Sequence, residues 1–412
     1  MTTNPRSLRP AFPLSKHPFV LGACLFGLVA GCGRDLVIGI DGIDIHPGSD
    51  TGTGGSSGAI GSGGFGGVAG SGGAIGSGGF GGVAGSGGAI GSGGSGGVGG
   101  PISEACQPIS TTPGTMNACG RTTGVALSPD GTLLAAVTQK GGAYLHVWRL
   151  SDGSLVQEPP DAAGSGDAYS VTFSPDGALI ATAGVAPGNA KTNTVHLWNT
   201  ATGALVRTLP TQCGSYASGL AFSHDGARLA TGGAQNQIEI WNVATGARML
   251  SIPYAGSVYA AHFSADDTRL ITTSYLVATV WDPTTGKKLM EITGLEDEMN
   301  EAVFSPDDQM ILTTAELGKV KVLTGGGALL QTLAFHAESA TPYFSHAAWV
   351  GNDAFVVDDW SGAVKEFKAN ASGSFALAQS WTLDTQALGM AVSPDHKTLV
   401  VGGDSGFFFL AL

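Results

Sequence analysis

One short pattern recurs beyond Pro101 and limits what this chain can fold into. Its seven copies are 41 to 49 residues apart and start at Val125, Val171, Leu220, Ala261, Ala302, Ala347 and Met390. VTFSPDGALIATA, from Val171, is representative: an apolar strand, a turn built on Pro-Asp-Gly, and a second strand. Proline pre-sets the turn's backbone angle and aspartate can bond its own backbone. The sequence therefore predicts a repeated strand–turn–strand unit.

Most copies continue into two further strands. The third strand ends in an aromatic residue, as in TVHLWNT, which places Trp148, Trp198, Trp241 and Trp281 at equivalent positions. A turn such as NTATG and a fourth strand such as ALVRTL follow. Four short strands in each repeat predict an all-β fold in which each copy forms one blade of a seven-bladed β-propeller.

The copies resemble WD40 repeats, whose pattern is V-x-F-S-P-D-G-x-x-L-A-S-G followed by a strand that closes on W-D. The resemblance extends from about residue 102 to residue 412, and it is clear in the first five copies and weaker in the last two. Trp281-Asp282 is the one true W-D pair, and the family's Gly-His dipeptide and regular aspartate are missing. The resemblance implies a propeller that serves as a protein-binding platform.

The last copy ends one strand short of a complete blade. It supplies strands near Leu388–Val392, Thr398–Gly402 and Phe407–Leu410. An open edge invites aggregation, so another segment should pair there. We expect that segment between Ile102 and Thr115, which would close the ring as in WD40 propellers.

The first 31 residues have the pattern of an export signal. Arg6, Arg9 and Lys16 precede an apolar run at 19–30, which is too short for a stable membrane span. Val29-Ala30-Gly31-Cys32 resembles the lipobox of bacterial lipoproteins, in which the cysteine is acylated. Gly33 stands where an inner-membrane retention aspartate would stand. We therefore expect an exported lipoprotein, anchored by Cys32 in the outer membrane and facing the periplasm or the cell surface.

Residues 32–100 form an acidic leader followed by a Gly/Ser-rich segment with a 15-residue period. Such a composition buries too little apolar area to offset the entropy of ordering glycine, so we expect a disordered tether. The segment contains a G-x-G-x-x-G match at Gly61 and a G-x-S-x-G match at Gly93. Both motifs need a strand–turn–helix context that this composition does not provide. We divide the chain into a signal (1–31), a tether (32–100) and a propeller (101–412).

Three cysteines remain after Cys32: Cys106, Cys119 and Cys213. An exported chain meets an oxidising compartment, so one disulfide is expected. Cys106 and Cys119 would close the smallest loop and staple the closing strand, although a pair with Cys213 remains open.

No catalytic motif stands out in the sequence. His262 lies on an expected inner strand where the other copies carry alanine, threonine or valine, so it could face the central channel. A net charge of −13 with 12% charged residues argues against a nucleic-acid partner. We expect no metal, no cofactor and no catalytic residue.

A partner-binding face is expected where loops enter the first strand of each blade. Tyr169, Tyr259 and Asn300 occupy one repeat position there, beside the acidic loop with Glu296, Asp297 and Glu298. We expect a monomeric, non-catalytic scaffold that binds an unknown protein or envelope polymer. A propeller enzyme (hydrolase, lactonase or quinoprotein-like) and a binding propeller resembling those of the Tol system are the alternatives.

Overall fold

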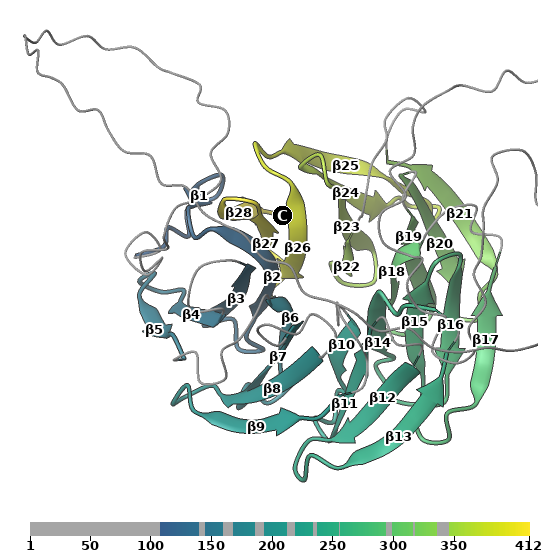
Figure 1. Ribbon diagram of the computed structural model, residues 1–412. Helices are drawn as coiled ribbons and strands as arrows, with labels where there is room; N and C mark the ends of the chain where they lie inside the picture. The colour runs from purple at the N-terminus through teal and green to yellow at the C-terminus, as the bar shows by residue number, and fades with distance from the viewer. Residues whose placement is uncertain are drawn as a thin grey trace, which may run out of the picture. The chain divides into compact units, whose positions relative to one another are not determined.

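The computed structural model describes residues 108–139, 145–159, 168–185, 193–211, 219–233, 237–254, 256–293, 299–315, 318–335 and 346–412. Within these ranges the regular structure consists of 28 strands, which form seven four-stranded antiparallel sheets. The sheets follow one another around a ring. The strand that begins each repeat copy lies nearest the centre of the ring (Figure 1). The predicted seven-bladed, all-β propeller is confirmed.

Each blade is numbered by its repeat. Blade 1 consists of β2 (Arg121–Leu127), β3 (Leu133–Gln139), β4 (Leu145–Arg149) and β5 (Leu155–Gln157). Blade 2 consists of β6 (Ala168–Phe173), β7 (Leu179–Val185), β8 (Asn193–Asn199) and β9 (Leu205–Leu209). Blade 3 consists of β10 (Gly219–Phe222), β11 (Arg228–Gly232), β12 (Gln237–Asn242) and β13 (Arg248–Pro253). Blade 4 consists of β14 (Ala260–Phe263), β15 (Leu270–Ser274), β16 (Val277–Trp281) and β17 (Lys288–Ile292).

The remaining blades follow the same order, with one exception. Blade 5 consists of β18 (Met299–Phe304), β19 (Met310–Ala315), β20 (Lys319–Thr324) and β21 (Leu329–Ala334). Blade 6 consists of β22 (Ala347–Trp349), β23 (Ala354–Asp358), β24 (Ala363–Ala369) and β25 (Phe375–Thr382). Blade 7 combines β26 (Ala387–Val392), β27 (Thr398–Gly403) and β28 (Gly406–Ala411) with β1 (Met116–Asn117) from the start of the described chain.

The strand β1 closes the ring, slightly later in the chain than the sequence indicated. Met116 pairs with Phe408 and Asn117 with Phe407, and Gly114 N donates to Phe409 O at 2.7 Å. The predicted location, Ile102 to Thr115, is therefore wrong for the strand itself. The Asn117 side chain bonds the backbone N–H and C=O of Ser110 (2.6 and 2.9 Å). This turn returns the chain toward blade 7 and leaves only two residues for the ladder.

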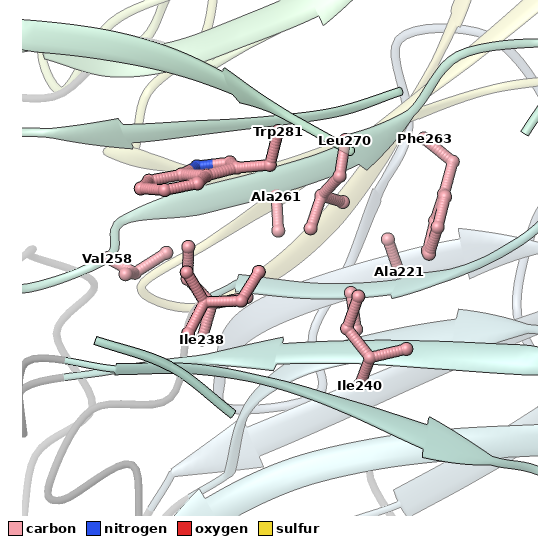
Figure 2. Close-up of a cluster of buried hydrophobic side chains, with 10 residues drawn as sticks. Ala221, Ile238, Ile240, Val258, Ala261, Phe263, Leu270 and Trp281 are labelled. Atoms are coloured by element: carbon pink, nitrogen blue, oxygen red, sulfur yellow. The ribbon is translucent and has the colours of Figure 1, made fainter. Parts of the chain in front are cut away.

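The hydrophobic core is divided among the gaps between blades. Seven buried clusters fill these gaps, each shared by two consecutive blades, and the last joins blade 7 to blade 1. Figure 2 shows the cluster between blades 3 and 4, where Ile238 and Ile240 face Phe263, Leu270 and Trp281. Each such buried side chain contributes about 1.5–3 kcal/mol. The blades therefore depend on their neighbours for stability.

The tryptophan that recurs on the third strand donates a hydrogen bond in blades 2, 3 and 4. The indole N–H groups of Trp198, Trp241 and Trp281 donate to the hydroxyls of Thr182, Thr231 and Thr272 at 2.9, 3.1 and 2.9 Å. At the matching register position blades 5, 6 and 7 carry Leu323, Phe367 and Leu410. The indole bond is thus a feature of the better-preserved repeats.

The turn between the first two strands is built as the sequence predicted. In six blades the serine hydroxyl donates to the aspartate two residues later, at 2.5 to 2.7 Å. In blade 4 this bond, with the backbone and hydroxyl donors of Thr268, lowers the pKa of Asp266 to about 2. Blade 6 lacks the serine, and its turn is one residue shorter, with Val350 N bonded to Ala354 O.

Candidate functional site

The antiparallel order of each blade places two kinds of connection on each face of the ring. The serine turns and the turns between third and fourth strands share one face. The connections from second to third strand, and from one blade to the next, share the other face, called here the binding face. Those predicted partner residues that the structure describes, Tyr169, Tyr259 and Asn300, belong to the binding face.

Tyr169, Tyr259 and Asn300 do occupy equivalent places at the start of the inner strands. All three are half-buried, and the Thr273 hydroxyl donates to Asn300 O at 3.1 Å. The Asn300 amide nitrogen is shielded from solvent and has no hydrogen-bond partner within the described residues. Glu296, Asp297 and Glu298 lie outside the described residues, as does Cys32. The role of these residues in partner binding stays a prediction.

Two exposed residues on the binding face were missed by sequence reasoning. Tyr275 and Leu276 form the tight connection between β15 and β16 in blade 4, with 56% and 45% of their surface exposed. They follow β15, whose Thr273 is bonded to the first strand of blade 5 through Asn300. An exposed aromatic next to a leucine on a rigid turn is suited to protein contact.

The inner strands of blades 4 and 5 contribute a histidine–carboxylate pair. His262 Nε2 lies 2.5 Å from Glu301 Oε1. His262 points away from the core, because its neighbours Ala261 and Phe263 on β14 are the ones buried between the blades. The sequence predicted the inner-strand position of His262 but gave no indication that Glu301 would be its partner.

Blade 6 contributes a second pair beside the first. His346 Nδ1 lies 3.0 Å from Asp358 Oδ1, which also accepts the His346 backbone N–H at 2.9 Å. Asp358 is completely buried, whereas a third of the His346 side chain is exposed. Burial favours the neutral imidazole, but attraction to Asp358 and then to Glu301 outweighs it and raises the pKa of His346 to about 9. His346 is therefore protonated at neutral pH.

These four residues, His262, Glu301, His346 and Asp358, are called the inner polar cluster. Glu301 and His346 share one repeat position, four residues before the turn. The other blades carry small residues at this position, namely Gly124, Ser170, Gly219, Ala260 and Gly389. At Gly389 a side chain would meet the backbone of Thr123 and Gly124 in blade 1. Blades 5 and 6 thus differ from the rest of the ring by having large ionisable side chains there.

The cluster does not have the geometry of a metal site. Among the described residues, no group of three or more histidine, cysteine, aspartate or glutamate side chains is arranged to hold a metal ion. Each carboxylate instead contacts one imidazole. The arrangement offers charged and hydrogen-bonding groups from three consecutive blades to whatever binds there.

His146 and His196 have structural surroundings. His146 and His196 are buried next to Trp148 and Trp198, and His196 Nδ1 lies 3.0 Å from the Thr208 hydroxyl. Burial lowers the pKa of His196. These side chains pack within their blades and are separate from the inner polar cluster.

Cys119 is fully buried in the cluster between blades 7 and 1, and it is disulfide-bonded. Cys106 and Cys213, its two candidate partners, lie outside the described residues. The predicted pairing of Cys119 with Cys106 therefore stays a prediction.

Comparison with known families agrees with the repeat structure. The family model described as WD domain, G-beta repeat matches residues 161–199 and 203–242. The second match begins just before the outer strand of blade 2 and ends with the third strand of blade 3, so it is offset from the blade by one strand. A search of curated proteins found no match. Within the described ranges, no helix has the length and apolar character needed to cross a membrane. These two stretches are therefore similar to WD40 repeats, and they lie within a β-propeller of seven blades.

Proposed function

We propose that this protein is a membrane-tethered, non-catalytic scaffold that binds a protein partner on the binding face of blades 4 to 6. The observation that carries the proposal is the exposed Tyr275–Leu276 turn, which lies on the face at which the inner strands of blades 5 and 6 begin, next to Glu301 and His346. WD40 propellers are typically interaction platforms, and a rigid turn loses little entropy when it is buried by a partner.

The chemistry of the inner polar cluster favours binding over catalysis. His346 and Asp358 have the geometry of a histidine held by an acid, which is one half of many catalytic arrangements. A general base must be deprotonated near the working pH, however, and the raised pKa of His346 keeps it charged. A fixed imidazolium beside carboxylates is better suited to recognising polar groups of a partner.

The tether and the envelope location rest on the sequence. Val29-Ala30-Gly31-Cys32 has the lipobox pattern, and the Gly/Ser-rich residues that follow would give the propeller reach. We propose acylation of Cys32, an outer-membrane anchor and action as a monomer. Mass measurement of the N-terminal peptide tests the anchor, with Cys32→Ser as the unmodified control.

Photo-crosslinking in the native host tests the partner site. A photoreactive residue at Leu276 should capture one protein, whereas the same residue at Thr284, exposed on the opposite face of blade 4, should not. His346→Gln should reduce the adduct at Leu276 without changing the amount of folded protein. Equal capture from both positions, or capture unaffected by His346→Gln, would refute the assignment. An adduct with an envelope polymer would keep the scaffold role but replace the protein partner.

A further inference from the structure

The outer edge of blade 6 differs from the other outer edges of the ring. Its last strand, β25, has the sequence FALAQSWT and is the longest among the described strands, with eight residues. It contains no charged residue and no proline, and six of its eight residues are exposed. Such an edge presents unpaired backbone groups to any extended chain.

Most of the other outer strands carry features that discourage strand addition. Arg207 lies in the middle of β9, Pro253 ends β13 and β17 exposes the ion pair of Lys288 with Glu291. The outer strands β5 and β1 have only three and two residues. Only β21 of blade 5, with the sequence LLQTLA, shares the uncharged character of β25 among outer strands longer than three residues.

One residue of β25 already has a substitute for a strand partner. The Gln331 side chain, from β21, donates to Phe375 O at 2.8 Å and accepts from Phe375 N at 2.8 Å. A side-chain amide offers the same donor and acceptor as a peptide group. Beyond it, the outward backbone groups from Ala376 to Thr382 have no partner within the described residues. After this amide, seven residues of the edge are open, with a bulge at Ala378 where the register with β24 shifts.

Exposed apolar side chains lie on this edge and on the outer strand of blade 5. Leu377 on β25 is 54% exposed, and Leu329 and Leu330 on the neighbouring β21 are 58% and 57% exposed. Side chains of an added strand would alternate between the two faces of blade 6, and those next to Leu377 would be apolar.

We propose that β25 binds an extended, uncharged segment of a partner protein, which adds to blade 6 as a fifth strand. Backbone hydrogen bonds would supply affinity and Leu377 would supply selectivity. A second copy of this chain is a poorer occupant. Each copy carries a net charge of −13, and one strand pair alone buries less than the roughly 1,200 Å² of a stable interface. This site is separate from the binding face, so the two proposals can fail independently.

The test uses the full chain and a dye-labelled synthetic peptide with the β25 sequence, FALAQSWT. Fluorescence anisotropy should show saturable binding, and amide hydrogen exchange of residues 376–382 should slow on binding. N-methylation of alternate residues on one edge of the peptide should abolish binding. N-methylation of the other set should leave it intact, because only one edge faces β25.

Matched variants locate the site. Ala378→Lys places a charge on the edge and should weaken peptide binding at least tenfold, whereas Leu289→Lys, on the outer strand of blade 4, should not. No saturable binding, or equal effects of the two lysines or of the two methylated peptides, would overturn the proposal. Sedimentation showing a dimer that Ala378→Lys dissociates would replace the partner segment with a second copy.

Discussion

The carboxylate of Asp267 in blade 4 accepts the backbone N–H of His224 in blade 3 at 2.7 Å. Its second oxygen accepts from Asp225 N at 2.8 Å. Asp308 in blade 5 holds Ala265 and Asp266 of blade 4 in the same way. Both aspartates have positive φ, at 59° and 60°, where blades 1, 2 and 3 have glycine and blade 7 has His396. At Gly131, Gly177 and Gly226, an added Cβ would instead lie 3.7 to 3.8 Å from the ring of a proline in the preceding blade. Proline has no N–H group that needs an acceptor. In these five turns, glycine therefore follows a turn with proline, and aspartate follows a turn whose backbone N–H groups need an acceptor.

This matching predicts a coupled pair of substitutions. Asp267→Gly should destabilise the protein by about 1–2 kcal/mol, because two charge-assisted bonds are lost while backbone strain is relieved. Adding His224→Pro recreates the pairing of blades 1 and 2 and should recover part of that loss. Urea unfolding of the wild type, both single variants and the double variant measures the coupling. Purely additive effects would contradict the proposed matching of turns.

Ring closure should depend on the absence of a side chain at Gly406. A Cβ there would overlap the carbonyl oxygen of Asn117 in the closing strand, and φ is +148°. Gly406→Ala should therefore lower the melting temperature by several degrees and promote aggregation through the exposed edge of β28. Gly373→Ala is the control, since its φ is +78° but nothing lies within 4 Å of the added atom. If the two variants lose equal stability, backbone strain alone explains the effect and closure is not involved.

Because His346 is paired with Asp358, the free energy of unfolding should fall as the pH becomes alkaline. The pKa of His346 is raised from 6.5 to about 9, so its contribution is fully present below about pH 6.5 and is lost as the pH rises through 9. The imidazole proton signals of His346 should titrate near pH 9 by NMR, and His346→Gln should flatten the stability profile over this range. A titration midpoint of His346 near pH 6.5 would show that Asp358 does not stabilise the charged imidazolium.

We expect the disulfide partner of Cys119 to be Cys106. Peptide mapping of the exported protein without reduction should give one linked pair containing both residues, and Cys106→Ser should release Cys119. Closing so short a loop stabilises the folded ring by about 3 kcal/mol in the chain-entropy account, so reduction should lower the melting temperature. A linked peptide containing Cys213 would exclude the predicted pairing.

The seven-bladed ring could be predicted from the sequence because most blades carry the same local signals. The serine–aspartate turn and the third-strand tryptophan are local signals, and both appear where the repeat placed them. The closing strand was misplaced because Met116-Asn117 is too short for any apolar pattern. Its position is set by the Asn117–Ser110 turn and by pairing with a distant strand.

The candidate site was predicted only in part. His262 was found because it interrupts a column of small residues, but His346 precedes the repeat copy that begins at Ala347. Extending the aligned copies one residue toward the N-terminus would have placed Glu301 and His346 in one column. That Glu301 contacts His262, and that Asp358 contacts His346, follows from the register of neighbouring strands and blades. Spacing along the sequence does not reveal such contacts.

Because β1 pairs with β28, the last step of folding joins the two ends of the propeller. Met116 meets Phe408, about 290 residues later, whereas the sheets of the other six blades pair strands that follow one another in the chain. Each of those six can form as soon as its own strands are available. Blade 7 must wait for the complete chain, and it bears the entropy of closing the largest loop. Assembly should therefore proceed quickly to an open arc and slowly to the ring, with β28 exposed to misassembly in between.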